Sequence, residues 1–412
     1  MNKNVVFLFS TLLVSAAISG QDFYTVAGQI KDSKTHLPLE FATIGIKGKS
    51  VGTVSNSKGS FEFHIPSELS IDTLLVSYVG YENYYLNISQ HGESMPLMIG
   101  LKQKPMVLDE ILIRAKSVGA KDIVKTAIKR IKDNYPDEPF RLECFFREIE
   151  IENDKCVQVS EAAIQLYDKS FITKRGSLQE YINVLGVRRS HSHRQMKGYN
   201  NLGSAIVDLI ENNDVCYQDG MLKIKKNQYQ LDSLSYYNDR LVYVISMSNR
   251  LDSGTLLIDT ETYAFIKISL ERRKRNYKTH PYYFNWPYVD SLRLGRVMFS
   301  FSVEFRELNG KMYPSYMNEN EESHVYDPDT NSVSIYKHEN LELVVNEIVT
   351  GNTAGNFKKR KLSRDYTIEI GEYDELFWKH YNILKLSPLD TRMIADLVKE
   401  MSVEDHFKQL KK

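Results

Sequence analysis

Alternation of apolar and polar residues is the feature that most constrains how this chain folds. In the segment 299–305, four apolar residues alternate with polar ones, and this period of two places the apolar side chains on one face of a β-strand. Asn309–Gly310 follows and is typical of a two-residue hairpin turn. Aromatic residues, which favour strands, make up 11% of the chain. The pattern predicts a mainly β fold, α+β overall, built from antiparallel hairpins.

The segment 118–412 is predicted to form one antiparallel β-rich domain with helices at its start and end. Apolar residues recur at helical spacing over residues 123–131, and Pro136 ends this helix. Two more helices are expected over residues 372–384 and 389–409. Besides the alternating segment, strands are expected over residues 141–151, 156–166, 241–245, 255–259, 263–268, 312–317, 333–336 and 341–349.

Two cysteines lie in the first predicted hairpin of this domain, whose turn is Asn153–Asp154. Counting from the turn, Cys156 faces Ile151, and Cys144 lies about seven residues further along. At about 3.3 Å per residue the two sulfur atoms are more than about 20 Å apart, which is beyond the reach of a disulfide. We therefore expect these two cysteines and Cys216 to be buried thiols.

A single lysine followed by a short apolar run opens the chain. Lys3 precedes an apolar stretch over residues 5–18, which is short for a transmembrane helix, since that needs about 20 apolar residues. Residues 1–20 are therefore predicted to be a secretory signal peptide, with an uncleaved anchor as the alternative. The protein is expected to be exported, in the periplasm or associated with the outer membrane. No later stretch reaches 18 uninterrupted apolar residues, so no transmembrane helix is expected in the mature chain.

The segment 23–103 has short β-like runs separated by turn residues at intervals of about ten, which predicts a small antiparallel sandwich. Its characteristic blocks, in chain order, are Gly28-Gln29-Ile30-Lys31-Asp32, Pro38-Leu39-Glu40-Phe41-Ala42, Gly52-Thr53-Val54-Ser55-Asn56, Gly59-Ser60-Phe61 and Leu74-Leu75-Val76-Ser77-Tyr78-Val79-Gly80-Tyr81. This series resembles the carboxypeptidase-regulatory-like (transthyretin-like) β-sandwich of exported proteins in Gram-negative envelopes. The resemblance implies a non-catalytic, seven-stranded sandwich, which we expect to be joined to the larger domain by a linker over residues 104–117.

The larger domain has a weaker resemblance of its own. Its strand meander, which includes Gly254–Asp259, is similar to the curved half-barrels of periplasmic lipoprotein carriers. At the level of fold, this implies a half-barrel-like sheet.

Charged residues in two segments are candidate sites. Glu148, Glu150 and Glu152 share one strand face, as the carboxylates of a glycosidase would, but the same spacing fits a plain exposed face, which is our interpretation. His191 and His193 would share one face of an extended segment. No third metal ligand is identifiable by spacing, and nearby arginines oppose a cation. We interpret the segment as a solvated basic loop, with an anion site formed by Arg188, Arg189, His191 and His193 as the alternative.

A cationic run followed by aromatic residues is the second candidate site. The segment 281–288 has five aromatic residues and two prolines, next to basic residues, and such a segment suits stacking on a glycan or docking on a protein. A long loop held by its own aromatic side chains is the alternative. The candidate residues for a partner or glycan are Arg272, Arg273, Tyr282, Tyr283, Trp286 and Tyr288.

The net charge and the predicted cellular location together limit the classes of function that are expected. The chain has 53 basic and 53 acidic residues, and this balance argues against a dedicated nucleic-acid binder. We expect a non-enzymatic binding or scaffolding protein of the cell envelope, with a protein or glycan partner. No catalytic residue, cofactor or metal is predicted. The alternatives are an enzyme that processes envelope polymers through the larger domain, and a small outer-membrane β-barrel.

Overall fold

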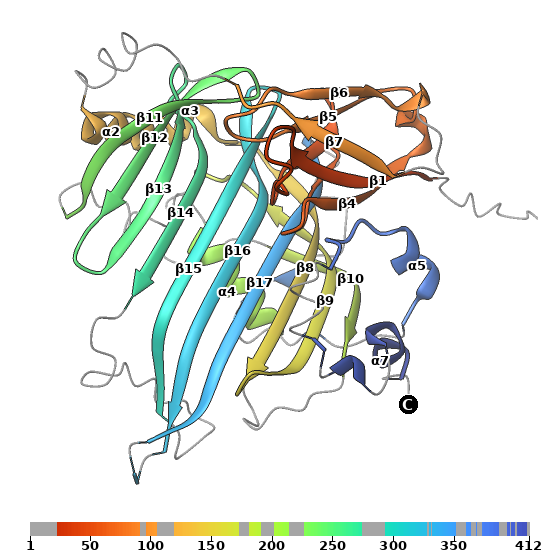
Figure 1. The fold of residues 1–412 in the computed structure, drawn as a ribbon, viewed down its shortest axis with the longest axis vertical. Helices are drawn as coiled ribbons and strands as arrows, with labels where there is room; N and C mark the ends of the chain where they lie inside the picture. Colours follow the sequence, from red (N-terminus) through yellow and green to blue (C-terminus); the bar gives the residue numbers. More distant parts are fainter. Residues whose placement is uncertain are drawn as a thin grey trace, which may run out of the picture.

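The computed structural model describes most of the chain, and Figure 1 shows a small β-sandwich beside one large curved sheet. The described residues are 23–90, 96–104, 119–172, 181–190, 202–213, 226–273, 293–327, 329–330, 332–351, 360–363, 368, 373–386, 394–395, 397–399 and 402–409. Strands dominate both parts, so the predicted mainly β fold is confirmed.

The sandwich has seven strands in two sheets, as the resemblance implied. The strands are β1 (Phe23–Asp32), β2 (Thr43–Ile46), β3 (Gly52–Val54), β4 (Ser60–Pro66), β5 (Thr73–Ser77), β6 (Tyr84–Asn87) and β7 (Leu97–Leu101). One sheet has the order β4-β1-β7 and the other β3-β2-β5-β6. The sequence did not identify β7, and this strand runs parallel to β1, whereas a purely antiparallel sandwich was predicted.

Apolar side chains from both small sheets meet between them. Phe61, Phe63 and Ile65 alternate along β4 and are fully buried, as their shared strand face predicts. They pack with Ile30 and Ile44 from the two facing sheets. This gives the sandwich a core of its own.

The larger part is a single eleven-stranded sheet of order β11-β12-β13-β14-β15-β16-β17-β8-β9-β10-β18. Its neighbouring strands are all antiparallel, and in Figure 1 they twist and curve together. The strands are β8 (Phe140–Glu152), β9 (Lys155–Asp168), β10 (Tyr181–Arg189), β11 (Gln228–Tyr237), β12 (Arg240–Ser248), β13 (Asp252–Asp259), β14 (Phe265–Arg273), β15 (Arg293–Leu308), β16 (Lys311–Tyr326), β17 (Val333–Thr350) and β18 (Arg360–Lys361).

Two-residue turns join the strands of the long hairpins at the positions that the sequence predicted. Both residues of Asn153–Asp154 and of Asn309–Gly310 have positive φ angles, between 50° and 74°. Such angles suit two-residue turns whose twist matches the strands. The first turn sets Cys156 opposite Ile151, as predicted. Cys144 and Cys156 are buried free thiols, and Cys216 lies outside the described residues.

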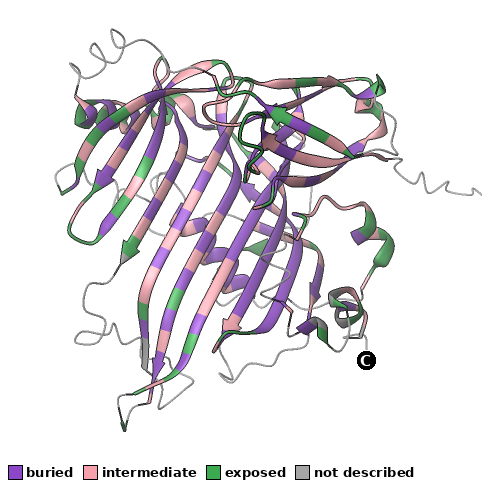
Figure 2. Cartoon of the chain, viewed as in Figure 1, coloured by how far each residue is buried: buried purple, intermediate pink, exposed green. Residues whose placement is uncertain are grey.

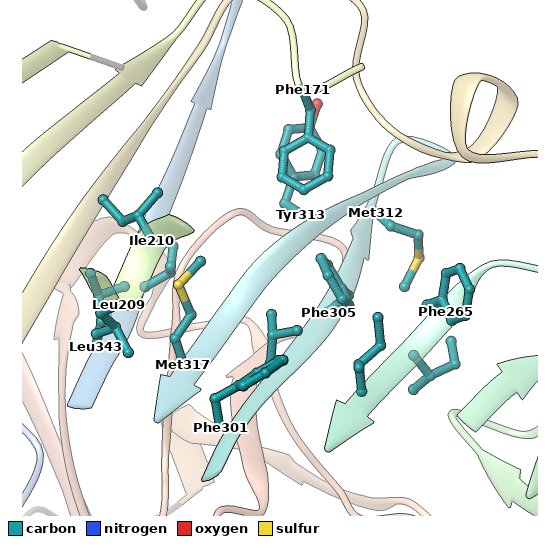
Figure 3. Close-up of a cluster of buried hydrophobic side chains, with 14 of the residues drawn as sticks. Phe171, Leu209, Ile210, Phe265, Phe301, Phe305, Met312, Tyr313, Met317 and Leu343 are labelled. Carbon is teal, nitrogen blue, oxygen red and sulfur yellow. The ribbon is translucent and has the colours of Figure 1, made fainter. Parts of the chain in front are cut away.

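One face of the large sheet, called the inner face here, carries the main apolar core. It includes Phe301, Val303 and Phe305 from the alternating segment of β15. Helix α2 (Ala120–Lys129), followed by α3 (Ile131–Asn134), and helix α4 (Leu202–Asn213) contribute buried side chains to this core. Figure 3 shows Leu209 and Ile210 of α4 beside residues of β15, β16 and β17.

Helix α4 was not predicted, although its neighbour α2 was. Ile123, Val124 and Ala127 form the buried stripe of α2, with charged residues opposite, as the spacing indicates. In α4, eight of twelve residues are buried. A helix enclosed by apolar contacts on most sides lacks the one-sided stripe that reveals an amphipathic helix.

The opposite, outer face of the large sheet is covered in its central part by the sandwich and the C-terminal segment. Phe145 and Val344 of this face pack with Val54 of the sandwich and with Trp378 of α5 (Glu375–His380). Farther along, Ile149 packs with Phe407 of α7 (Val403–Gln409). As Figure 2 shows, buried residues dominate these central strands, because both faces are covered.

Two predictions about side chains and helices are wrong. Glu148, Glu150 and Glu152 are each 1% exposed, so the interpretation as an exposed face does not hold. They lie on the inner face, which is the face toward which the sheet curves. The helix predicted over residues 389–409 is not continuous, because Leu397–Lys399 is a short 3-10 helix and Ser402 lies outside any helix before α7.

Candidate functional site

The sandwich is joined to the large sheet by main-chain hydrogen bonds. Gly80 N donates to Tyr236 O over 2.7 Å, and Ile348 N donates to Ser50 O over 3.2 Å. These bonds connect loops of the sandwich to β11 and β17, which lie six places apart in the large sheet. Attachment at two separated strands fixes the orientation of the sandwich on the outer face.

A buried guanidinium lies within this junction. Arg306 Nη2 of β15 donates to Ser50 O over 2.7 Å. Burial lowers the pKa of Arg306 to about 10, which still leaves it charged at neutral pH. A Cβ atom on Gly52 would lie 2.2 Å from Arg306 Nη1 and 2.8 Å from the main-chain oxygen of Ile44, which cannot move aside as a side chain can, so glycine is required here.

The two parts together line a partly open cavity of about 300 Å³. This is at the lower end of the range for small-molecule sites, about 300–1,000 Å³. The cavity is lined from the sandwich by Phe41, Thr43, Ser77, Tyr78 and Val79, and from the large sheet by Tyr237, Thr255, Leu257, Lys267, Ser269 and Glu304. We call it the junction cavity.

An ion pair forms part of the floor of the junction cavity. Lys267 on β14 and Glu304 on β15 are direct cross-strand neighbours, and Lys267 Nζ donates to Glu304 Oε1 over 2.5 Å. Burial by itself would lower the pKa of Lys267, but the charge and hydrogen bond of Glu304 outweigh it and hold that pKa above its usual value. The ammonium and carboxylate therefore neutralise each other within the cavity.

Hydroxyl groups from both parts meet in the lining of the junction cavity. Tyr237 hydroxyl lies 3.4 Å from Thr43 Oγ1 and also hydrogen-bonds Ser77. Burial raises the pKa of Tyr237 and of Tyr78, so both phenols stay neutral near pH 7. At another wall, Phe41 stacks on Tyr316 of the sheet with ring centroids 4.7 Å apart.

A second polar cluster lies on the outer face and has the character of a structural network. Four charged residues of alternating sign stand in register across four strands: Glu342, Arg147, Glu161 and Arg188. Glu161 accepts from Arg147 over 2.7 Å and from Arg188 over 2.6 Å. Burial alone would raise the pKa of Glu161, but the two guanidinium groups lower it overall. The carboxylate thus stays charged.

This network also holds the C-terminal segment. Arg147 Nη2 donates to Leu384 O over 2.5 Å. The Arg188 guanidinium lies 4.3 Å from the Trp378 ring centroid and 4.9 Å from that of Phe407. The charged residues of this network therefore hold the C-terminal segment against the sheet and do not line an open cleft.

The predicted anion site is only partly within the described residues. Arg188 pairs with Glu161 on the outer face, whereas the adjacent Arg189 donates through Nε to Ser160 Oγ over 3.0 Å. Neighbouring strand residues point to opposite faces, so these two guanidinium groups do not share one side of the sheet. His191 and His193 lie outside the described residues, and a site that includes them stays a prediction.

The predicted glycan or partner site also lies mostly outside the described residues. Arg272 Nε donates to Asp252 Oδ1 over 2.6 Å between β14 and β13. Arg273 is the last residue of β14. The aromatic candidates Tyr282, Tyr283, Trp286 and Tyr288 are not described, so their role stays a prediction.

Sequence reasoning missed every residue of the junction cavity. The residues come from segments up to 263 positions apart, Phe41 and Glu304 being the extremes. Eight of these eleven residues lie on strands, whereas Phe41, Tyr78 and Val79 lie in turns or loops of the sandwich, and hydroxyl residues on strands are common. The one usable signal was Lys267, a charged residue between the apolar positions Ile266 and Ile268.

The described residues include neither a metal-binding cluster nor a membrane-spanning helix. Among them, no group of three or more His, Cys, Asp or Glu side chains is placed to hold a metal ion. Within the same part of the chain, no helix is both long and apolar enough to cross a membrane.

Comparisons with known proteins bear mainly on the N-terminal part. None of the curated proteins matches the sequence. The solved structures that this chain resembles include a DUF1329 family protein from Desulfovibrio piger, at 8% identity and a TM-score of 0.24, covering 57% of this chain and 93% of the other. A lipovitellin structure described by its lipid–protein interactions matches at 7% identity and a TM-score of 0.25, covering 56% of this chain and 28% of the other. At these TM-scores neither likeness carries an argument.

The family comparison covers the sandwich. The family model of the CarboxypepD_reg-like domain matches residues 26–113. That range begins within β1 and includes all the later sandwich strands. The N-terminal part of this chain is therefore a CarboxypepD_reg-like domain.

Proposed function

We propose that this chain is a non-enzymatic binding or scaffolding protein of the cell envelope, and that the junction cavity is its binding site. One observation carries the proposal: the cavity is lined by two parts that main-chain hydrogen bonds hold in a fixed orientation. A site whose walls are fixed before binding loses little conformational freedom when a ligand enters.

The envelope location rests on the start of the chain and on the type of domain present. Lys3 and the apolar run that follows have the layout of a secretory signal. The sequence blocks of the CarboxypepD_reg-like domain resemble modules of exported envelope proteins. Both point to work outside the cytoplasm, and residues 1–20 are proposed to be removed on export.

Photo-crosslinking in native cells tests the proposal. A photo-reactive amino acid replaces Thr255, an exposed residue of the cavity wall, and the matched control carries it at Lys121, an exposed residue of α2. We expect the mature protein in the envelope fraction and a crosslinked envelope component from position 255 only. An unprocessed protein in the cytosol, or identical products from both positions, would contradict the proposal.

A further inference from the structure

We propose that the junction cavity binds one neutral sugar ring. This deepens the proposed function and rests on it, because it names the ligand class of the same site. Four properties of the junction cavity support a neutral sugar: its charge, its hydroxyl groups, its apolar walls and its size.

The charges lining the junction cavity cancel. Lys267 and Glu304 are bonded to each other at 2.5 Å, and among the described residues that line the cavity they are the only ones of acidic or basic type. An anionic ligand would meet the Glu304 carboxylate, and a cationic ligand would meet the Lys267 ammonium. Either would have to break the pair at a cost in electrostatic energy. A neutral ligand keeps the pair and can accept from the ammonium and donate to the carboxylate.

Hydroxyl groups supply most of the remaining hydrogen-bonding capacity. They come from both parts of the molecule, and the residues that carry them are Thr43, Ser77, Tyr78, Tyr237, Thr255 and Ser269. Each hydroxyl both donates and accepts. Sugars carry adjacent hydroxyl groups with the same double capacity, so the cavity and the rim of a sugar ring are chemically matched.

The apolar walls match the other surface of a sugar. Phe41 and Tyr78 bring aromatic rings from the sandwich, and Leu257 brings an aliphatic side chain from the sheet. A pyranose exposes C–H groups on its two faces, and these pack against apolar side chains. Phe41 is held in place by its stack on Tyr316, so one wall is fixed in advance.

The volume sets the size of the ligand. A cavity of about 300 Å³ corresponds to roughly ten water molecules at about 30 Å³ each. That suits one ring of about a dozen non-hydrogen atoms. Thr255 is exposed at the cavity wall, which leaves an opening through which the next residue of a glycan could leave.

Titration of the full mature chain with glucose, N-acetylglucosamine and glucuronate tests the inference by calorimetry or saturation-transfer NMR. We expect at least one neutral sugar to bind with a Kd of the order of 1 mM, as ligand efficiency allows for this size. Glucuronate has the same ring with a carboxylate, and we expect it to bind at least about tenfold more weakly. Equal binding of glucuronate, or no binding of either neutral sugar, would overturn the inference.

Three variants place the binding in the junction cavity. Thr255→Trp fills its opening from an exposed position, and we expect binding to fall at least about tenfold with the melting temperature preserved. Tyr78→Phe removes one hydroxyl and keeps the ring, with an expected loss of about fivefold. Tyr236→Phe is the matched control, since Tyr236 neighbours Tyr237 without lining the cavity, and its affinity should not change. Full affinity in Thr255→Trp would overturn the location.

Two further arms separate the possible outcomes. A disaccharide that binds at least as tightly as its monosaccharide indicates the end of a glycan as the source, whereas binding of the monosaccharide alone indicates a free sugar. Both results support the inference. If no sugar binds but position 255 still crosslinks an envelope component in cells, the sugar assignment is wrong and the proposed function stands. If position 255 also gives no specific crosslink, both are wrong.

Discussion

Arg147 and Glu161 face each other across β8 and β9, with Arg147 Nε donating to Glu161 Oε1 over 2.7 Å and both side chains almost fully buried. Glu161 also pairs with Arg188, so one carboxylate lies between two guanidinium groups. Desolvating three charges is costly, and the arrangement is stable only while the central negative charge is present.

This geometry predicts an asymmetry between two variants. Glu161→Gln leaves two buried guanidinium groups without the charge between them, so it should lower the free energy of unfolding by about 3–5 kcal/mol. Arg188→Met leaves the Arg147–Glu161 pair intact and should cost clearly less. Urea denaturation of both variants measures the difference. The exposed pair Lys408–Glu375 provides the control, because Glu375→Gln should change little. Equal losses in the two buried variants would refute the central role of Glu161.

Glu319 on β16 predicts how stability changes with pH. Burial raises its pKa to about 8, although Asn212 Nδ2 of α4 donates to its carboxylate over 2.8 Å. The folded protein therefore holds a proton that the unfolded chain releases near pH 4.5. This contribution to stability is fully present below pH 4.5 and is lost as the pH rises toward 8.

Glu319→Gln removes that dependence, because glutamine has the same shape and stays neutral. The free energy of unfolding of the variant, relative to that of the native protein, should increase steadily between pH 5 and pH 8. Denaturant unfolding at each pH measures this difference. Glu68→Gln, at an exposed residue of the sandwich, is the control and should leave the pH profile unchanged. A constant difference between Glu319→Gln and the native protein over this range would contradict the burial argument.

Gly52 lies where the sandwich approaches the sheet closely, and we predict that a larger side chain at this position destabilises the protein. An added Cβ would lie 2.2 Å from Arg306 Nη1 and 2.8 Å from Ile44 O. We expect Gly52→Ala to destabilise the protein by about 1–3 kcal/mol, as overpacking does. Gly100→Ala is the control, since its nearest contact would be an ordinary 3.4 Å from Ser33 Cβ. Thermal unfolding compares them, and similar melting temperatures would show that the junction tolerates the extra atom.

The elements that the sequence predicted are those whose evidence is local. The alternation along β15, the Asn309–Gly310 turn and the stripe of α2 each lie within about a dozen residues. Helix α4 and strand β7 were missed because their identity depends on neighbours far along the chain. The same reason hid the junction cavity, since Tyr78 and Lys267 come together only when the sandwich docks on the sheet.

The buried glutamates show a different limit. Alternation along β8 correctly placed Glu148 and Glu150 on one face, but it could not show which face curves inward. A charged stripe on a strand is normally exposed. Here the sheet folds around it, and sheet curvature is a property of eleven strands together.

From the hydrogen bonds of Asp32 we predict that acid destabilises the CarboxypepD_reg-like domain. Its carboxylate accepts from the main-chain nitrogens of Lys34 and Thr35 and from the side chains of Tyr81 and Gln103. The bond from Thr35 is the largest of the causes that lower its pKa far below the usual value. The folded-state pKa is depressed, so the stabilisation is present above about pH 3.8 and is lost as the pH falls below that value.

Asp32→Asn should therefore destabilise the domain at pH 7 and reduce its sensitivity to acid. The amide keeps the size of the side chain but loses the charge that the four donors share. Hydrogen exchange at the amide of Thr35, followed by NMR at pH 7 and pH 3, reports the local bond directly. In the native protein we expect protection at pH 7 that weakens at pH 3, and in the variant weak protection at both values. Equal protection of the two proteins at pH 7 would show that the charge does not hold this turn.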